Sequence, residues 1–148
     1  MADFRARFFD ELTVRELYEI VRARCEIFLL EQSIVCRDFD GIDYDSLHCF
    51  LVEEDGRVVG YLRAFLTEAG EVQIGRVLSL THGVGLGGRL MREALPVIRE
   101  RLGGRRIMLH SQKHAEGFYK KLGFVTVSEV FLEEGIPHVT MELEGGIV

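Results

Sequence analysis

Residues 79–91 read SLTHGVGLGGRLM, and four of the six residues from Gly83 to Gly88 are glycine. The residues before this stretch predict a strand over about 71–79, and those after it predict a helix. The first turn of a helix carries unpaired N–H groups and the positive end of the helix dipole, and glycine lets a ligand approach the backbone closely. The stretch therefore predicts a strand–loop–helix turn that binds phosphate, with a tight turn that binds nothing as the alternative.

Apolar residues at helical spacing predict the helix that follows the glycine loop. Gly103 and Gly104 are expected to end it, because glycine favours the position just after a helix. Pro96 is expected to kink it, since proline lacks the N–H group that would bond to the carbonyl of Arg92. The expected buried face consists of Leu90, Met91, Ala94, Leu95, Ile98 and Leu102.

The residues before the loop predict a strand, a helix and three more strands. A strand over 4–10 precedes a helix that starts at Thr13, where Thr13 and Glu16 form a capping box. Residues 33–46 are polar and irregular. Strands over about 47–54 and 57–67 meet at Asp55-Gly56, a dipeptide typical of hairpin turns, and the strand over 71–79 follows. The expected buried face of the first helix consists of Leu17, Ile20, Val21, Cys25 and Phe28.

The residues after the second helix predict a strand over 105–110, a short helix capped by Ser111 and ending near Gly123, and strands over about 124–132 and 138–143. The order β-α-β-β-β-α-β-α-β-β predicts an α+β fold, with a mixed central sheet of about six to seven strands flanked by helices. The chain shows no linker and no internal repeat, so residues 1–148 are expected to form a single domain.

Composition limits the function classes. The 148 residues are 47% hydrophobic and carry a net charge of −6 without a basic stripe, which argues against nucleic acid as a partner. No apolar run is long enough to span a membrane. Cys25, Cys36 and Cys49 cannot all pair and match no zinc or redox motif, so reduced thiols and a cytoplasmic location are expected. The acidic balance either suits a cationic substrate or only keeps the protein soluble.

Two common classes of phosphate ligand, dinucleotides and nucleoside triphosphates, do not fit the sequence around the glycine loop. Gly83, Gly85 and Gly88 match the dinucleotide fingerprint G-x-G-x-x-G. The acidic residue that this fingerprint expects about 20 positions later is missing. A Lys-Ser/Thr pair, as in nucleotide triphosphatases, does not follow the glycines either. Nicotinamide and nucleotide triphosphate chemistry are therefore disfavoured.

Metal binding is not expected. His110 and His114 have a spacing that metal ligands use on a helix, but the glutamate of H-E-x-x-H is absent. The acidic loop over 38–45 does not fit an EF-hand, so it is either an acidic lip for a cationic substrate or a solvated loop. Arg63 and Arg76 either pair with Glu31 or an aspartate of this loop, or bind an acidic group of the substrate. The aspartates of the loop are Asp38, Asp40, Asp43 and Asp45.

A second motif lies about thirty residues after the loop, in QKHAEGFYKKLGF over 112–124. Together with the loop, it resembles the GNAT superfamily of acyl-CoA-dependent N-acyltransferases. The family signature R/Q-x-x-G-x-G/A falls on residues 82–87, with His82 where the family usually has arginine or glutamine. The later family motif N-x-x-A-x-x-x-Y-x-x-x-G-F falls on Gln112, Ala115, Tyr119, Gly123 and Phe124.

Further stretches narrow the resemblance to the ElaA-like branch of this superfamily, over residues from about 8 to 143. They are RCEIFLLEQ over 24–32, DFDG over 38–41 with His48, IGRV over 74–77 and EGIPH over 134–138.

The resemblance implies an N-acetyltransferase that moves the acetyl group of acetyl-CoA to a primary amine of a small molecule or peptide, by direct transfer in a ternary complex. It implies that the backbone of Val77 and Leu78 holds the pantetheine arm of the coenzyme. It also implies that Tyr119 lies near the sulfur and protonates the leaving thiolate. The other residues implied in coenzyme binding are His82, Gly83, Val84, Gly85, Leu86, Gly87, Gly88 and Gln112.

The general base that would deprotonate the amine stays open. Glu71, on the strand before the loop, is one candidate, and Glu31, His48 and His138 are others; water could also take the proton. Because no base is evident, a catalytically silent CoA-binding sensor or interaction module is the alternative function. A nicotinamide-dependent enzyme is a third, and a homodimer is left open.

Overall fold

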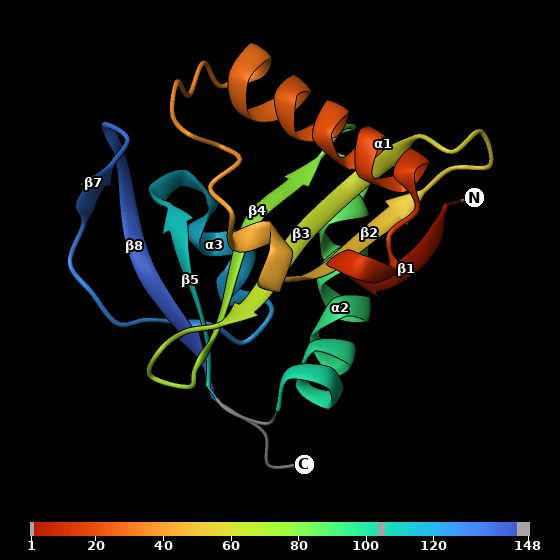
Figure 1. Cartoon of the computed structure of the whole chain (residues 1–148). Coiled ribbons are helices and arrows are strands. Elements are labelled where there is room, and N and C mark those ends of the chain that lie inside the picture. Colours follow the sequence, from red (N-terminus) through yellow and green to blue (C-terminus); the bar gives the residue numbers. More distant parts are fainter. Residues whose placement is uncertain (1, 104–105, 145–148) are drawn as a thin grey trace.

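An eight-stranded mixed sheet forms the centre of the computed structural model, which describes residues 2–103 and 106–144 (Figure 1). β4 and β5 pair in parallel, and the other strand pairs of the described residues are antiparallel. The strands follow the order β1-β2-β3-β4-β5-β8-β6, and β7 also pairs with β8. The expected α+β fold is thereby confirmed. The strands are β1 (Asp3–Phe8), β2 (Leu47–Val52), β3 (Val58–Leu66), β4 (Val72–Ser79), β5 (Ile107–Gln112), β6 (Val125–Thr126), β7 (Phe131–Glu133) and β8 (Ile136–Leu143).

Helices cover both faces of the sheet. α1 (Val14–Arg24) packs on one face and α2 (Leu86–Leu102) on the other, while α3 (Glu116–Lys120) is short. Successive side chains of a strand point to opposite faces. In β2, Cys49 therefore joins the apolar cluster of α2, whereas Phe50 joins that of α1. This explains why every position of β2 is buried.

The first helix starts as expected, and its buried face matches the expected one in part, since Ile20 is buried and Leu17, Val21 and Phe28 are half-buried. Thr13 Oγ1 accepts a hydrogen bond from the backbone N–H of Glu16 at 3.0 Å, and the Glu16 carboxylate accepts one from the N–H of Thr13 at 2.9 Å. After Arg24 the helix continues as a π-helix, η2 (Cys25–Glu31). Cys25 is exposed, so its place on the expected buried face is wrong. The expected face consisted of apolar residues and so did not include Arg24. This residue is buried because aspartates farther along the chain neutralise its charge.

The second helix begins inside the glycine stretch of residues 83–88 rather than after it. α2 starts at Leu86, runs through Pro96 and ends before Gly103, which has φ 101. The kink at Pro96 stays a prediction. Gly104 and Arg105, expected to end the helix and to start the next strand, lie outside the described residues. Within the described residues, no helix is long and apolar enough to cross a membrane.

The carboxyl-terminal part corrects two expectations. β5 extends to Gln112, so Ser111 is a strand residue and caps no helix; its Oγ donates to the Gln112 carbonyl at 2.8 Å. The strand expected over 124–132 is split into β6 and β7. Between them, Ser128 Oγ accepts a hydrogen bond from the N–H of Thr140 at 2.8 Å, so a side chain replaces the backbone partner of β8. This break produces the eighth strand.

β4 and β5 separate after three residue pairs. Residues 72–74 pair with residues 107–109, and beyond them both strands continue without pairing to each other. The β3–β4 register shifts beside this point, and Arg76 adopts a left-handed conformation with φ 55. A bulge of this kind bends a strand and re-aims its side chains. The second half of β4 therefore has no strand neighbour on the side of β5.

Candidate functional site

Two hollows border the separation of β4 and β5. The larger has a volume of about 970 Å³ and is lined by residues of β3, β4, β5, β8 and the segment 32–45. The smaller has a volume of about 370 Å³ and is lined by the end of β4, the glycine loop and the start of α2. Gln32 and Val77 line both hollows. The two hollows therefore adjoin beside the second half of β4, and one extended ligand could occupy parts of both.

The smaller hollow presents unpaired backbone donors. Gly83 and Gly85 both have φ 80, a conformation that glycine adopts without strain, and α2 starts from Gly85. The first hydrogen bond of this helix runs from the N–H of Arg89 to the carbonyl of Gly85 at 3.1 Å. In the part of the chain that the structure describes, no acceptor takes the N–H groups of residues 86–88. Such donors at a helix N-terminus suit a phosphate group.

The residues predicted to bind the coenzyme diphosphate come together at the smaller hollow, with one exception. Val84 is 62% exposed and does not line it. His82 Nε2 lies 3.0 Å from Glu31 Oε2, and both side chains are largely exposed. This contact connects the glycine loop to the end of η2. The predicted residues that line the smaller hollow are Val77, Leu78, His82, Gly83, Gly85, Leu86, Gly87 and Gly88.

Tyr119, on α3, is both a core residue and a wall residue of the larger hollow. Its side chain packs edge-on between Phe118 and Phe124, whose ring centroids lie 5.0 and 5.9 Å from its own. Only 8% of the residue is exposed, and burial raises the pKa of Tyr119. The phenol therefore keeps its proton at neutral pH.

Gln112 lies at the end of β5, across the separation from Val77. Its Nε2 donates a hydrogen bond to Gln32 Oε1 at 3.1 Å, and its Oε1 lies 2.8 Å from His114 Nε2. The side-chain amide lines the larger hollow, as expected of a ligand-binding residue, but both of its polar ends already have side-chain partners. A ligand that bound this amide would exchange with one of them.

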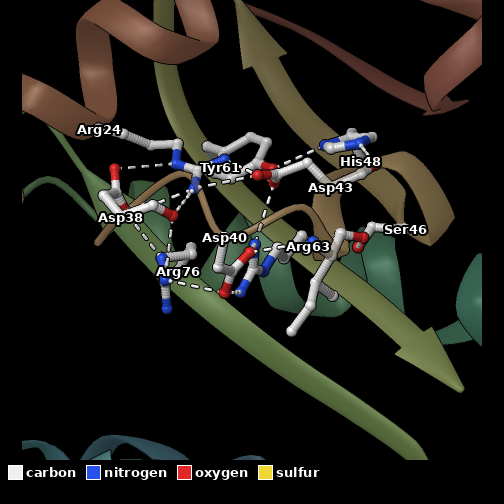
Figure 2. A network of polar contacts seen from close by, with 10 residues as sticks. Arg24, Asp38, Asp40, Asp43, Ser46, His48, Tyr61, Arg63 and Arg76 are labelled. Carbon is white, nitrogen blue, oxygen red and sulfur yellow. Dashed lines mark hydrogen bonds and ion pairs between the residues drawn. The ribbon is translucent and has the colours of Figure 1, made fainter. Parts of the chain in front are cut away.

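Three arginines and three aspartates form a closed ion network beside the larger hollow (Figure 2), and four of these six residues line it. Each arginine contacts two aspartates, and the shortest N–O distances are 2.7 Å for Arg24, 2.8 Å for Arg63 and 2.6 Å for Arg76. Each aspartate also has two arginine partners. With three positive and three negative side chains, the formal charge of the network is zero. The aspartates of the network are Asp38, Asp40 and Asp43.

The network fastens the segment 38–43 across the sheet. Its arginines come from α1, β3 and β4, and the side chains of Arg24 and Arg63 are only 2% and 3% exposed. The acidic loop is thus neither an acidic lip nor a solvated loop at these aspartates, and both expectations are wrong there. The pairing of Arg63 and Arg76 with aspartates of the loop is confirmed, whereas Glu31 contacts His82 instead.

Hydrogen bonds from the Arg63 guanidinium lower the pKa of Asp40 to about 2. Burial alone would raise the pKa of Asp43, but the hydrogen bonds and charges of Arg24 and Arg63 lower it below its ordinary value. Both carboxylates are therefore ionised at neutral pH. The sequence did not predict that Arg24 belongs to this network. An arginine beside apolar helix positions does not indicate which acidic residues it will contact.

Three of the four candidate bases are unsuited to that role by their positions. Glu71 lies just before β4 and lines neither hollow, and Glu31 contacts His82. The ring of His48 is buried, with Nδ1 2.7 Å from the Tyr61 hydroxyl and Nε2 2.9 Å from the Asp43 carbonyl. Burial also lowers the pKa of His48. Its ring is neutral and occupied at both nitrogens.

Two histidines flank Glu133 on another wall of the larger hollow. His138, the fourth candidate, is 6% exposed, with Nδ1 2.7 Å from the Ile136 carbonyl and Nε2 3.7 Å from Glu133. His110 Nδ1 lies 2.8 Å from Glu133 Oε1. His110 belongs to β5 and His114 to the turn after it, so they do not share a helix. Among residues 2–103 and 106–144, no group of three or more His, Cys, Asp or Glu side chains is arranged to hold a metal ion.

Sequence comparison relates the chain to acetyltransferases. A family model described as the acetyltransferase (GNAT) domain matches residues 39–145. Protein ElaA of Escherichia coli is 32% identical over 150 residues, which cover 97% of this chain and 97% of that protein. A UPF0039 protein of Schizosaccharomyces pombe is 34% identical over 145 residues, covering 96% and 97% of the two chains.

Solved structures show the same relationship. The crystal structure of an acyl-CoA N-acyltransferase from Pseudomonas aeruginosa is 34% identical in sequence and superimposes with a TM-score of 0.88, over 97% of this chain and 99% of that one. The crystal structure of Escherichia coli ElaA is 31% identical, with a TM-score of 0.90 over 97% and 100% of the two chains. Both likenesses extend over nearly the whole chain.

Proposed function

Because this chain belongs to the GNAT family of acetyltransferases and is similar to ElaA, we propose that it moves the acetyl group of acetyl-CoA to a primary amine in a ternary complex. The observation that carries the proposal is the separation of β4 and β5, beside which a hollow rich in backbone donors adjoins a hollow lined by Tyr119. Direct transfer requires both reactants to lie side by side, and the adjoining hollows allow this. The three free cysteines suit a cytoplasmic location.

The smaller hollow holds the diphosphate of the coenzyme in this proposal. The N–H groups of residues 86–88 supply hydrogen bonds, and the start of α2 supplies the positive end of a helix dipole. Val77 and Leu78 lie between the glycine loop and the larger hollow, so their backbone binds the pantetheine amides on the side where β4 has no strand neighbour. Acetyl-CoA supplies the activated thioester.

Tyr119 acts as the general acid. A proton donor must be protonated, and burial keeps the phenol of Tyr119 in that state. In water a phenol has a pKa of about 10 and a thiol one of about 8.5. Burial disfavours both anions, so a thiolate that forms inside the hollow has a higher proton affinity than it has in water. Tyr119 lies on the wall of that hollow and protonates the leaving sulfur.

The larger hollow receives the amine. Apart from the neutral ion network, its lining contains Asp45, Glu68 and Glu134, and none of these forms an ion pair within the described residues. Their negative charge attracts an alkylammonium ion. An alkylammonium has a pKa near 10, so it must lose a proton before it can attack the thioester.

Release of free thiol from acetyl-CoA in the presence of an amine panel tests the proposal. Tyr119→Phe should slow release by about 10²-fold or less while coenzyme A binding, followed by calorimetry, is retained. Tyr18→Phe is the matched control, because Tyr18 is 63% exposed on α1. An enzyme that neither binds coenzyme A nor releases thiol would refute the proposal. Binding without turnover would favour a CoA sensor, and stabilisation by NAD(P) alone would favour a nicotinamide enzyme.

A further inference from the structure

His110 is held by two side chains on the face of the sheet that forms the larger hollow. Side chains alternate along β5, so Ser111 is buried on the opposite face while His110 and Gln112 line the hollow. Glu133 Oε1 lies 2.8 Å from His110 Nδ1, and the ring of Phe131 packs edge-on against the imidazole with centroids 5.3 Å apart. Both partners belong to β7, which lies with β8 beside β5 in Figure 1.

A tight hairpin fixes the position of Glu133. β7 and β8 are joined by Glu134 and Gly135, whose φ angles are 51° and 75°, as in the two-residue turns with both central residues left-handed that match the twist of paired strands. Glu133 itself pairs with Ile136 across this turn. The carboxylate is thus presented to His110 by paired backbone rather than by an irregular loop.

The contact with Glu133 determines which nitrogen of His110 can accept a proton. An ionised carboxylate only accepts hydrogen bonds, so Nδ1 of the neutral imidazole carries the hydrogen and Nε2 carries the free lone pair. Within the described residues, the structure assigns no partner to this Nε2. His138 differs, because it is almost fully buried with oxygen atoms facing both ring nitrogens. His114 contacts the amide of Gln112 rather than a carboxylate.

We propose that His110 is the general base of the acceptor amine and that Glu133 is its positioning residue. This inference rests on the proposed transfer to an amine. His110 Nε2 takes one proton from the ammonium, and the charge of Glu133 stabilises the imidazolium that forms. The freed amine nitrogen bonds to the carbonyl carbon as the carbon–sulfur bond breaks. Tyr119 gives its proton to the sulfur and regains one from the same nitrogen, directly or through water, and His110 releases its proton to solvent.

Two amines of similar size but different basicity provide the test. Ethylamine is protonated at neutral pH, whereas trifluoroethylamine is mostly unprotonated because fluorine withdraws electrons from its nitrogen. A general base is needed for the first amine and not for the second. His110→Gln should therefore lower kcat/KM for ethylamine by about 10²–10⁴-fold, and for trifluoroethylamine by less than about tenfold. Glu133→Gln should show the same selectivity with a smaller loss.

Glu129→Gln is the matched control for Glu133→Gln, since it removes the same charge from an exposed residue just before β7 that does not line the hollow. Calorimetry with coenzyme A shows whether each variant is folded, and Glu133→Gln carries the test if His110→Gln fails to fold. Equal losses with both amines, or an unchanged kcat/KM for ethylamine, would overturn the role of His110. Failure of the wild-type protein to acetylate any amine would instead overturn the proposed function.

Discussion

Replacement of Arg24 by methionine is the sharpest test of the ion network. The Arg24 guanidinium donates hydrogen bonds to Asp38 and Asp43, at distances from 2.7 to 3.5 Å, and lies over the ring of Phe39 at 4.9 Å. Methionine fills a comparable length with apolar atoms but provides no donor. The network then carries one uncompensated negative charge beneath the surface.

The expected loss of stability follows from the remaining contacts. Removing one partner of a buried ion pair costs about 3–5 kcal/mol. Here Asp38 keeps Arg76 at 2.6 Å and Asp43 keeps Arg63 at 3.1 Å, so the lower end of that range, about 3 kcal/mol, is expected. For a domain of this size 1 kcal/mol corresponds to about 2–4 °C, so Tm should fall by about 6–12 °C.

Thermal and urea unfolding of wild type and Arg24→Met measure this loss. Arg22→Met is the matched control, because Arg22 lies one half-turn away on the same helix, is 58% exposed and has only a 3.6 Å contact with Glu19. It should change the free energy of unfolding by no more than about 0.5 kcal/mol. If Arg24→Met has the same unfolding midpoints as Arg22→Met, the network does not stabilise the fold and the reasoning fails.

Two further predictions concern pH and thiol reactivity. Because burial lowers the pKa of His48 in the folded state, the unfolded chain binds an additional proton below about pH 6.5, and stability should fall with pH from there. The folded-state pKa of Asp40 is about 2, so a second loss should begin below about pH 4. Unfolding midpoints across this pH range test both steps, and His48→Gln should remove the first; a flat profile between pH 7 and 5 would contradict it. Cys25 and Cys36 are exposed, while Cys49 is buried and its pKa is raised to about 12. A thiol reagent should therefore titrate two cysteines in the native protein and the third after denaturation, and modification of all three without denaturant would refute this.

The parts of the fold that the sequence predicted well are those determined by local chemistry. The capping box at Thr13 depends on residues within one turn of each other. The glycine stretch predicted the turn from β4 to α2, although the helix begins inside the stretch at Leu86. The strands on either side of Asp55-Gly56 are likewise defined by their own pattern and turn. The break between β6 and β7 could not be predicted, because it depends on Ser128 meeting Thr140 on a distant strand.

The candidate site divides in the same way. The glycine loop and Tyr119 belong to contiguous motifs, so their places beside the two hollows were expected. From the sequence, the aspartates of the segment 38–43 could be taken for solvent-exposed loop residues. Their partners Arg24 and Arg63 lie far away in the sequence, so these ion pairs could not be predicted. His110 and Glu133 are 23 residues apart and reach each other only through the pairing of β5, β8 and β7.

The sheet is joined at its centre by only the three residue pairs between β4 and β5 within the described strands. This makes the line between the β1–β4 and β5–β8 halves a seam, where few interstrand hydrogen bonds resist a small hinge motion. A ligand bound along this seam would contact both halves of the sheet. Binding should therefore reduce the motion of one half relative to the other. If coenzyme A binds there as proposed, the empty protein should be the more flexible of the two forms.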